Sequence, residues 1–151
     1  MTSKSYFESV RRAKKRAEAL EQTAELMNEH LGDAKGMRYD NVGGGHNKNG
    51  YTPCDAIIES VIRLEDAEKR VFDAKEHALS LVSEAYSVLA TMLEDDKADT
   101  TAIIVLRMYY LQGLSVEDIA SKIYKSGSNV SKIKQRGLRK AEPYLRRYSL
   151  I

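Results

Sequence analysis

The chain has 151 residues, of which 42% are hydrophobic, and this is enough to bury the core of one modest domain or of a small globular head with a helical extension. Its single cysteine, Cys54, rules out a disulfide within the chain and points to a reducing compartment. No apolar run approaches the roughly 20 residues of a membrane span, and no apolar stretch follows the basic N-terminal run. We therefore expect a soluble, cytoplasmic protein with no membrane partner.

The net charge of +2 conceals an uneven distribution along the chain. Residues 1–51 carry nine Lys and Arg against seven Asp and Glu, residues 52–100 carry five against twelve, and residues 101–151 carry ten against three. A basic end on an otherwise acidic chain is typical of a protein that places one part on a polyanion. The alternative is a dipolar protein whose halves attract each other or pair between subunits.

Residues 1–31 are predicted to form one long helix. Its apolar positions alternate spacings of four and three residues, which is the heptad pattern of a helix that packs along its length against another helix. These positions are Tyr6, Val10, Ala13, Ala17, Leu20, Ala24, Met27 and Leu31. Gly32 is placed to end the helix in a left-handed conformation. The basic run "RRAKKR", residues 11–16, forms either a solvated face or a track for a phosphate backbone.

Residues 32–54 have no apolar period and are rich in Gly, Asn and Asp, so we predict a loop or linker. Its "GGGHNKNG" stretch lacks the G-K-[ST] ending and the preceding strand of a phosphate-binding loop. His30, His46, Cys54 and His77 show no metal-ligand spacing, and no catalytic set of side chains stands out. We expect no metal, no cofactor and no enzymatic activity.

Residues 55–95 are predicted to form a second long helix, with Asp55 as its cap and Glu59 near the positive end of its dipole. A seam again repeats every four and three residues, and nine of its eleven positions are apolar. The seam is Ile57, Val61, Leu64, Glu68, Val71, Lys75, Ala78, Val82, Ala85, Leu89 and Met92. Two heptad helices indicate an antiparallel pair within one chain, a coiled coil between chains, or both. Because the alanines bury little area each, we expect a homo-oligomer.

The charged stretch "EDDKADTT" breaks the heptad pattern and offers Asp99, Thr100 or Thr101 as the cap of a third helix. Ile104, Met108 and Leu111 would lie on one face of that helix. Gly113 is placed to end it.

Two further short helices are predicted, one capped by Ser115 and one by Ser126. Ala120 provides the small residue that two crossing helices need where they approach each other. The expected core positions are Ile119, Ala120, Ile123, Val130, Ile133 and Leu138. Residues 100–151 are therefore predicted to form a helix-turn-helix head, which makes the whole fold all-α.

Residues 100–142 carry a family resemblance, because the stretch "LSVEDIASKIYKSGSNVSKIKQRGLRK" resembles the helix-turn-helix of sigma-factor region 4. With the preceding "YYLQG" it is similar to small phage transcription regulators of the RinA and ArpU type. The pattern L-S-x-E-[ED]-I-A-x-x-[LI] is matched at Leu114, Ser115, Glu117, Asp118, Ile119, Ala120 and Ile123. The pattern S-x-x-x-V-x-x-I-x-x-[KR]-[GA]-L-[RK]-[RK] is matched at Ser126, Val130, Ile133, Arg136, Gly137, Leu138, Arg139 and Lys140.

The resemblance implies that the helix from Ser126 to Lys140 lies in the major groove of DNA, with Ser126 among the DNA-binding residues. The positions that would face the bases or the nearest phosphates are Gly127, Ser128, Ser131, Lys132 and Gln135. The positions that would neutralise phosphates are Lys125, Lys134, Arg136, Arg139 and Lys140.

Side-chain chemistry adds to this expectation. Lys132 can donate to guanine and Gln135 can pair with adenine, but the tip of the helix has few long side chains. Most of the affinity should therefore come from phosphates and fall steeply with salt. Tyr124 stands where a tight turn frequently has glycine. A positive φ would cost a bulky residue about 1 kcal/mol, which predicts a reshaped turn.

The sequence therefore predicts a DNA-binding transcription regulator of phage or prophage origin that acts as an oligomer on double-stranded DNA. The family further implies control of late phage genes in the bacterial cytoplasm and RNA polymerase as a further partner. One alternative is a phage DNA-packaging initiation subunit, which also combines a helix-turn-helix with oligomerising helices. Another is a protein-interaction module that does not bind DNA.

Overall fold

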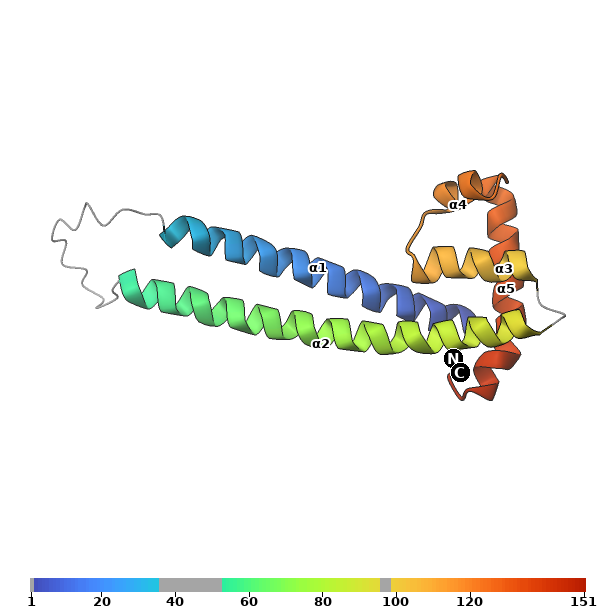
Figure 1. The fold of residues 1–151 in the computed structure, drawn as a ribbon, viewed down its shortest axis with the longest axis horizontal. Coiled ribbons are helices and arrows are strands. Elements are labelled where there is room, and N and C mark those ends of the chain that lie inside the picture. Colours follow the sequence, from blue (N-terminus) through green and yellow to red (C-terminus); the bar gives the residue numbers. More distant parts are fainter. Residues whose placement is uncertain (1, 36–52, 96–98) are drawn as a thin grey trace. The chain divides into compact units, whose positions relative to one another are not determined.

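The computed structural model describes residues 2–35, 53–95 and 99–151, which form helices and contain no strand (Figure 1). The elements are α1 (Ser3–Lys35), α2 (Pro53–Glu94), α3 (Thr100–Leu106), the π-helix η2 (Arg107–Leu111), α4 (Val116–Lys122) and α5 (Gly127–Arg147). The predicted all-α fold class is confirmed. None of the helices in these ranges is long and apolar enough to cross a membrane.

The ends of the two long helices differ from the sequence prediction. α1 continues to Lys35 and does not end at Gly32, since a glycine inside a helix costs only about 1 kcal/mol relative to alanine. α2 begins at Pro53, a residue suited to the first helical position. Asp55 therefore lies within the first turn of α2 and is not its cap. The part of the predicted loop from 36 to 52 lies outside the described residues.

The chain divides into two compact units. The first unit combines Met1–Lys15 with His77–Ile151, and the second is Arg16–Glu76. The first unit therefore contains the start of α1, the end of α2 and all of the shorter helices.

The larger core of the first unit is built from both long helices together with α3, η2 and α5. Its buried residues are Tyr6, Phe7, Val10, Ala85, Val88, Leu89, Met92, Ile103, Leu106, Tyr110, Leu111, Leu138, Ala141 and Leu145. Phe7 and Val88 are fully buried although neither belongs to a predicted heptad seam. The ends of α1 and α2 in this unit consequently bury more than the single stripe that a helical pair requires.

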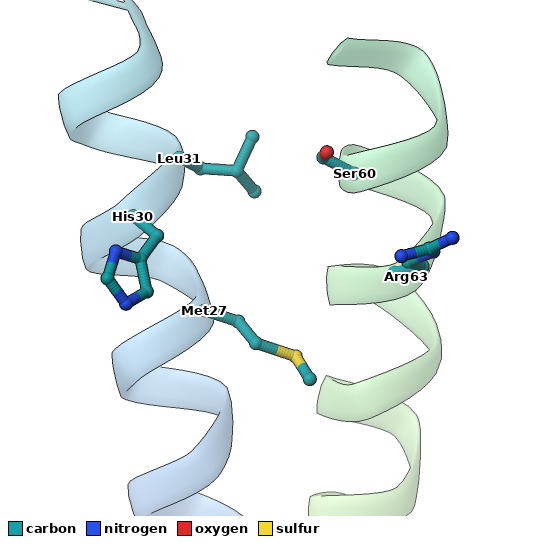
Figure 2. A pocket seen from close by; sticks show the side chains of 5 residues that line it. All are labelled: Met27, His30, Leu31, Ser60 and Arg63. Atoms are coloured by element: carbon teal, nitrogen blue, oxygen red, sulfur yellow. The ribbon is translucent and has the colours of Figure 1, made fainter. Parts of the chain in front are cut away.

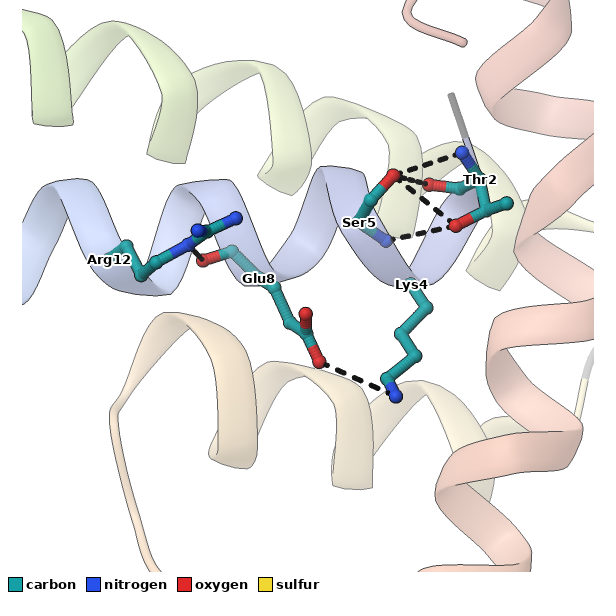
Figure 3. A network of polar contacts seen from close by, with 5 residues as sticks. All are labelled: Thr2, Lys4, Ser5, Glu8 and Arg12. Carbon is teal, nitrogen blue, oxygen red and sulfur yellow. Dashed lines mark hydrogen bonds and ion pairs between the residues drawn. The ribbon is translucent and has the colours of Figure 1, made fainter.

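The N-terminus of α1 is closed by reciprocal hydrogen bonds between Thr2 and Ser5 (Figure 3). The Ser5 amide donates to Thr2 Oγ1 at 3.2 Å, and the Thr2 amide donates to Ser5 Oγ at 2.9 Å. Lys4 and Glu8, which are one turn apart on α1, form an exposed ion pair. The capped turn fixes the helix just before Tyr6 and Phe7, which enter the core.

A smaller core joins α3, α4 and α5. It contains Ala102, Val105, Ile119, Val130 and Ile133, with Ala120 and Ile123 partly buried against it. Three of the core positions expected for the head, Ile119, Val130 and Ile133, are buried here, and Leu138 is buried in the larger core. α4 and α5 are thus held on α3 by apolar contacts.

A glycine allows α5 to approach α3 closely. A Cβ atom on Gly137 would lie 3.1 Å from Leu106 Cδ1 and 3.3 Å from Ala102 Cβ, both of α3. These distances are shorter than an ordinary side-chain contact, so glycine at position 137 lets α5 pack against α3 without crowding.

The second unit is loosely packed. Lys75 pairs with Glu21, and Ala17, Ala24 and Leu31 of the predicted α1 seam are buried. No side chain of α2 between Asp55 and Glu76 is fully buried in the single chain. A shallow hollow of about 250 Å³ lies between the helices (Figure 2). It is lined by Met27, His30, Leu31, Ser60 and Arg63.

Candidate nucleic-acid interface

α4 begins with a capping box between Ser115 and Asp118. The Asp118 amide donates to Ser115 Oγ at 3.1 Å, and Asp118 Oδ2 accepts from the Ser115 hydroxyl at 2.7 Å and from its amide at 3.3 Å. The predicted cap at Ser115 is confirmed. These bonds, the side-chain bond from Ser115 first, lower the pKa of the exposed Asp118 carboxyl below its usual 3.8.

The turn from α4 to α5 places Tyr124 in a left-handed conformation, with φ at 53°. The amide of Ile123 donates to the Ile119 carbonyl and the amide of Lys125 to the Ala120 carbonyl, each at 3.0 Å. The prediction of a reshaped turn was wrong. The backbone bonds of a glycine-type helix end are made with a tyrosine in the glycine position.

α5 begins at Gly127 with Ser126 as its cap, as predicted. Ser126 Oγ accepts from the Asn129 amide at 3.3 Å. A Cβ atom on Gly127 would lie 3.5 Å from Val116 Cγ1, an ordinary contact, so this flank of α5 faces the start of α4. Gly127 and Ser131, which were expected to face the bases or the nearest phosphates, are half-buried.

Another face of α5 is exposed and carries four of the predicted DNA-contacting residues at helical spacing. We call Ser128, Lys132, Gln135 and Arg139 the basic stripe. Lys140, which follows Arg139 in the chain, is also exposed. No acidic residue occurs on α5 before Glu142, and that carboxylate pairs with Arg146 at 2.8 Å. The stripe therefore presents positive charge and hydrogen-bonding groups without a competing anion on its own helix.

Lys134 is bound within the first unit. Its Nζ lies 3.7 Å from the centroid of the Tyr109 ring, and the Arg11 guanidinium carbon lies 3.9 Å from the same centroid. Two cations so close to one ring centroid require opposite faces of the ring, so Tyr109 of η2 joins α1 to α5. Lys134 was predicted to neutralise phosphate, and the structure gives it this contact within the first unit.

Arg136 is also paired internally. Its Nη2 lies 2.6 Å from Oδ2 of Asp99, whose Oδ1 accepts from the Ala102 amide at 3.2 Å as the cap of α3. Of the three caps that the sequence offered for this helix, Asp99 is the one used. Arg136 was predicted as a phosphate contact, and its charge is already offset by a carboxylate.

The basic run on α1 is partly turned toward the head. Lys14 Nζ donates to the Leu111 carbonyl at 3.0 Å, and Arg11 Nη2 to the Gly113 carbonyl at 3.5 Å. Leu111 is the last residue of η2 and Gly113 follows two residues later, so the cations lie near the end of a helix, where backbone acceptors lack helical partners and the dipole is negative. Arg12 and Lys15 are exposed. Neither a solvated face nor a phosphate track describes the whole run.

Among the described residues, no group of three or more His, Cys, Asp and Glu side chains could hold a metal ion. His46 and the side chain of Cys54 lie outside the described part of the chain.

Two features of this surface were not predicted from the sequence. The Tyr109 contact joins residues that are far apart in the chain, and no local pattern could reveal it. Tyr124 was recognised as a turn residue, but the 95% exposure of this residue is known only from the structure.

A comparison of the chain with protein-family models, with curated proteins and with solved structures found no match.

Proposed function

We propose that the protein is a transcription regulator that binds double-stranded DNA, with α5 entering the major groove. The basic stripe is the observation that carries this proposal, because its four residues, Ser128, Lys132, Gln135 and Arg139, form one exposed line on α5. Ser126 caps this helix. Its buried face packs against α3 and α4, which leave this line free.

The chemistry of the stripe divides the binding into two parts. Arg139, together with Lys140, supplies positive charge for phosphates, which determines affinity and its dependence on salt. Lys132 can donate to guanine O6 or N7, and Gln135 can form a bidentate pair with adenine. Because Lys134 and Arg136 have internal partners, we assign them to the stability of the head rather than to the main phosphate contact.

The regulatory role rests on the resemblance of residues 100–142 to sigma-factor region 4 and to phage regulators. The proposed role is the control of late phage genes in the bacterial cytoplasm. RNA polymerase is the further partner proposed for it. We infer this role from the matched motif together with the exposed line that the motif presents.

We further propose that the protein acts as a homo-oligomer through its long helices. Exposed apolar side chains on the second unit support this, notably Leu26 at 57%, Ile58 at 57% and Ile62 at 53% exposure. A second copy would remove them from water and would bring two heads to neighbouring sites, which raises affinity through effective concentration. Sedimentation of the intact protein tests this step, and a large closed ring would favour a DNA-packaging subunit instead.

The DNA proposal is tested with the intact protein and a fluorescent duplex of mixed sequence at about 50 mM and about 200 mM salt. The Lys132→Ala/Arg139→Ala/Lys140→Ala variant should bind more weakly at both salt concentrations. Its dependence of log affinity on log salt should be shallower by roughly 0.9 for each phosphate that the variant no longer neutralises.

A matched control removes three exposed cations elsewhere, in the Lys15→Ala/Lys69→Ala/Arg70→Ala variant. It has the same net charge as the stripe variant. Equal reductions of affinity in the two variants would show non-specific attraction and contradict the proposed interface, as would a wild-type protein that does not bind the duplex.

A further inference from the structure

Tyr124 occupies the last position of a helix end that normally takes glycine. Its φ of 53° and the Lys125 amide bond to the Ala120 carbonyl are those of a left-handed helix terminus. An L-residue there brings its Cβ close to the following carbonyl, so tyrosine makes the native turn less stable than glycine would.

The ring of Tyr124 gains no burial in exchange for this strain. Its exposed fraction is 95%, whereas Leu79, the next most exposed large apolar or aromatic side chain in the described segments, is at 70%. Strain that no internal contact offsets is most often found where a side chain serves a binding role.

The surroundings of Tyr124 indicate what it would bind. Lys122 and Lys125 are exposed on either side of it in the chain, and Ser126, two residues further on, caps α5. Ser128, the first residue of the basic stripe, follows within one helical turn. A phenol between two cations, at the N-terminal end of a helix, suits an anionic backbone better than an apolar partner.

We propose that Tyr124 is a phosphate-contacting residue of the DNA interface. Its hydroxyl donates to a phosphate oxygen at the edge of the groove that α5 occupies, and the ring lies along the adjoining sugar, with Lys122 and Lys125 on the neighbouring phosphates. This inference rests on the proposed function. It adds a neutral contact from the turn to an interface otherwise assigned to α5.

Stability and binding should respond in opposite directions to the removal of this side chain. Tyr124→Gly removes the strained Cβ, so its thermal midpoint should equal or exceed that of the wild type. Its affinity for the mixed-sequence duplex should fall by about tenfold to a hundredfold, the effect of removing a hydrogen bond to a charged group. The salt dependence should not change, because tyrosine carries no charge to release counterions.

Tyr124→Phe separates the hydroxyl from the ring. It keeps the turn and its strain, so its thermal midpoint should match the wild type, and its affinity should fall by most of the decrease seen in Tyr124→Gly. The control is Ser149→Gly at the end of α5, where Ser149 also has a left-handed φ, of 55°. Ser149→Gly should change stability in the same direction and leave DNA affinity unaltered.

The outcomes separate the two proposals. If the wild type binds the duplex and both Tyr124 variants bind equally well, the role of Tyr124 is overturned and the stripe remains. If Tyr124→Gly lowers the salt dependence, or if Ser149→Gly weakens binding by the same factor, the effect does not come from a neutral phosphate contact and the inference also fails. If the wild type does not bind, the DNA function fails and this inference fails with it.

Discussion

The Asp99 carboxylate caps α3 with one oxygen and binds Arg136 of α5 with the other, at an Nη2 to Oδ2 distance of 2.6 Å. The Arg136 side chain is 55% exposed and that of Asp99 only 18%. One carboxylate therefore fixes the start of α3 and ties it to the helix that carries the basic stripe.

This arrangement predicts different costs for different changes at Asp99. Asp99→Ala should lower the free energy of unfolding by about 1 kcal/mol for the missing cap, whereas Asp99→Asn, which can still cap, should remove only the ion pair. Because Arg136 is largely exposed, the pair itself should contribute no more than about 1 kcal/mol. Urea unfolding of both variants measures the difference.

Arg136→Ala should resemble Asp99→Asn in stability. Equal destabilisation by Asp99→Ala and Asp99→Asn would show that the cap contributes little and would contradict this interpretation of the Asp99 contacts.

Gly137→Ala is expected to destabilise the protein although alanine favours helix by about 1 kcal/mol over glycine. The new methyl group would lie 3.1 Å from Leu106, which is fully buried and cannot move aside without disturbing the core. Overpacking of this kind costs about 1–3 kcal/mol. The midpoint of thermal or urea unfolding shows whether Gly137→Ala lowers or raises the stability of the protein.

The same substitution in a Leu106→Ala background supplies the control. With the leucine removed, the methyl group has room, and Gly137→Ala should become neutral or stabilising. If Gly137→Ala has the same effect in both backgrounds, contact with Leu106 is not the cause.

Lys14→Ala should loosen the connection between η2 and α4. The bond to the Leu111 carbonyl contributes about 1 kcal/mol, and the effect of removing it should be local because Lys14 holds the end of η2. Amide hydrogen exchange should therefore become faster in residues 112–116. Lys15→Ala, on the exposed side of the same helix, is the matched control and should exchange like the wild type. Identical exchange in the two variants would count against this role of Lys14.

Tyr6→Phe should stabilise the protein at neutral pH. The Tyr6 hydroxyl is buried and has no hydrogen-bond partner among the described residues, so its removal relieves a desolvation cost of about 1–3 kcal/mol. A decrease in stability on this substitution would show that the hydroxyl is bonded, to water for example.

The same tyrosine predicts a response to alkali. Burial, with a smaller effect of Glu84, raises the Tyr6 pKa from 10.0 to about 12. The native state therefore holds the proton more tightly than the unfolded state, and the wild type should lose stability as pH rises from 10.0 through about 12. Because phenylalanine does not titrate, the advantage of Tyr6→Phe should widen across that window. Burial also raises the pKa of Tyr110 to about 12. Because Tyr110 is present in the wild type and in Tyr6→Phe, its titration affects the two proteins equally.

Local chemistry made much of the fold predictable from the sequence. The caps at Ser115 and Ser126 were found because such a cap bonds to an amide only three residues away. Most heptad positions of α1 were found because a helix repeats its buried face at a fixed period, although Met27 is exposed. The alternation of buried and exposed residues on α5 follows from the same period.

The candidate site was predictable only as a set of residues. Ten positions from Ser126 to Lys140 were expected to face DNA, and the structure separates the exposed stripe from the half-buried Gly127, Ser131 and Lys134. Arg136 is exposed like the stripe, but it is bound to Asp99.

The helices, most of their caps and the basic character of the C-terminal third follow from the amino-acid sequence, because these depend on neighbours within one or two helical turns. Which cations have partners within the protein depends on how the helices pack. Lys134 contacts the ring of Tyr109, and Lys14 donates a hydrogen bond to the Leu111 carbonyl. The partners in each contact are distant in the chain and meet only when the helices pack. A cationic side chain is most available to a ligand when no other group of the protein already pairs with it. Such pairing depends on contacts between helices.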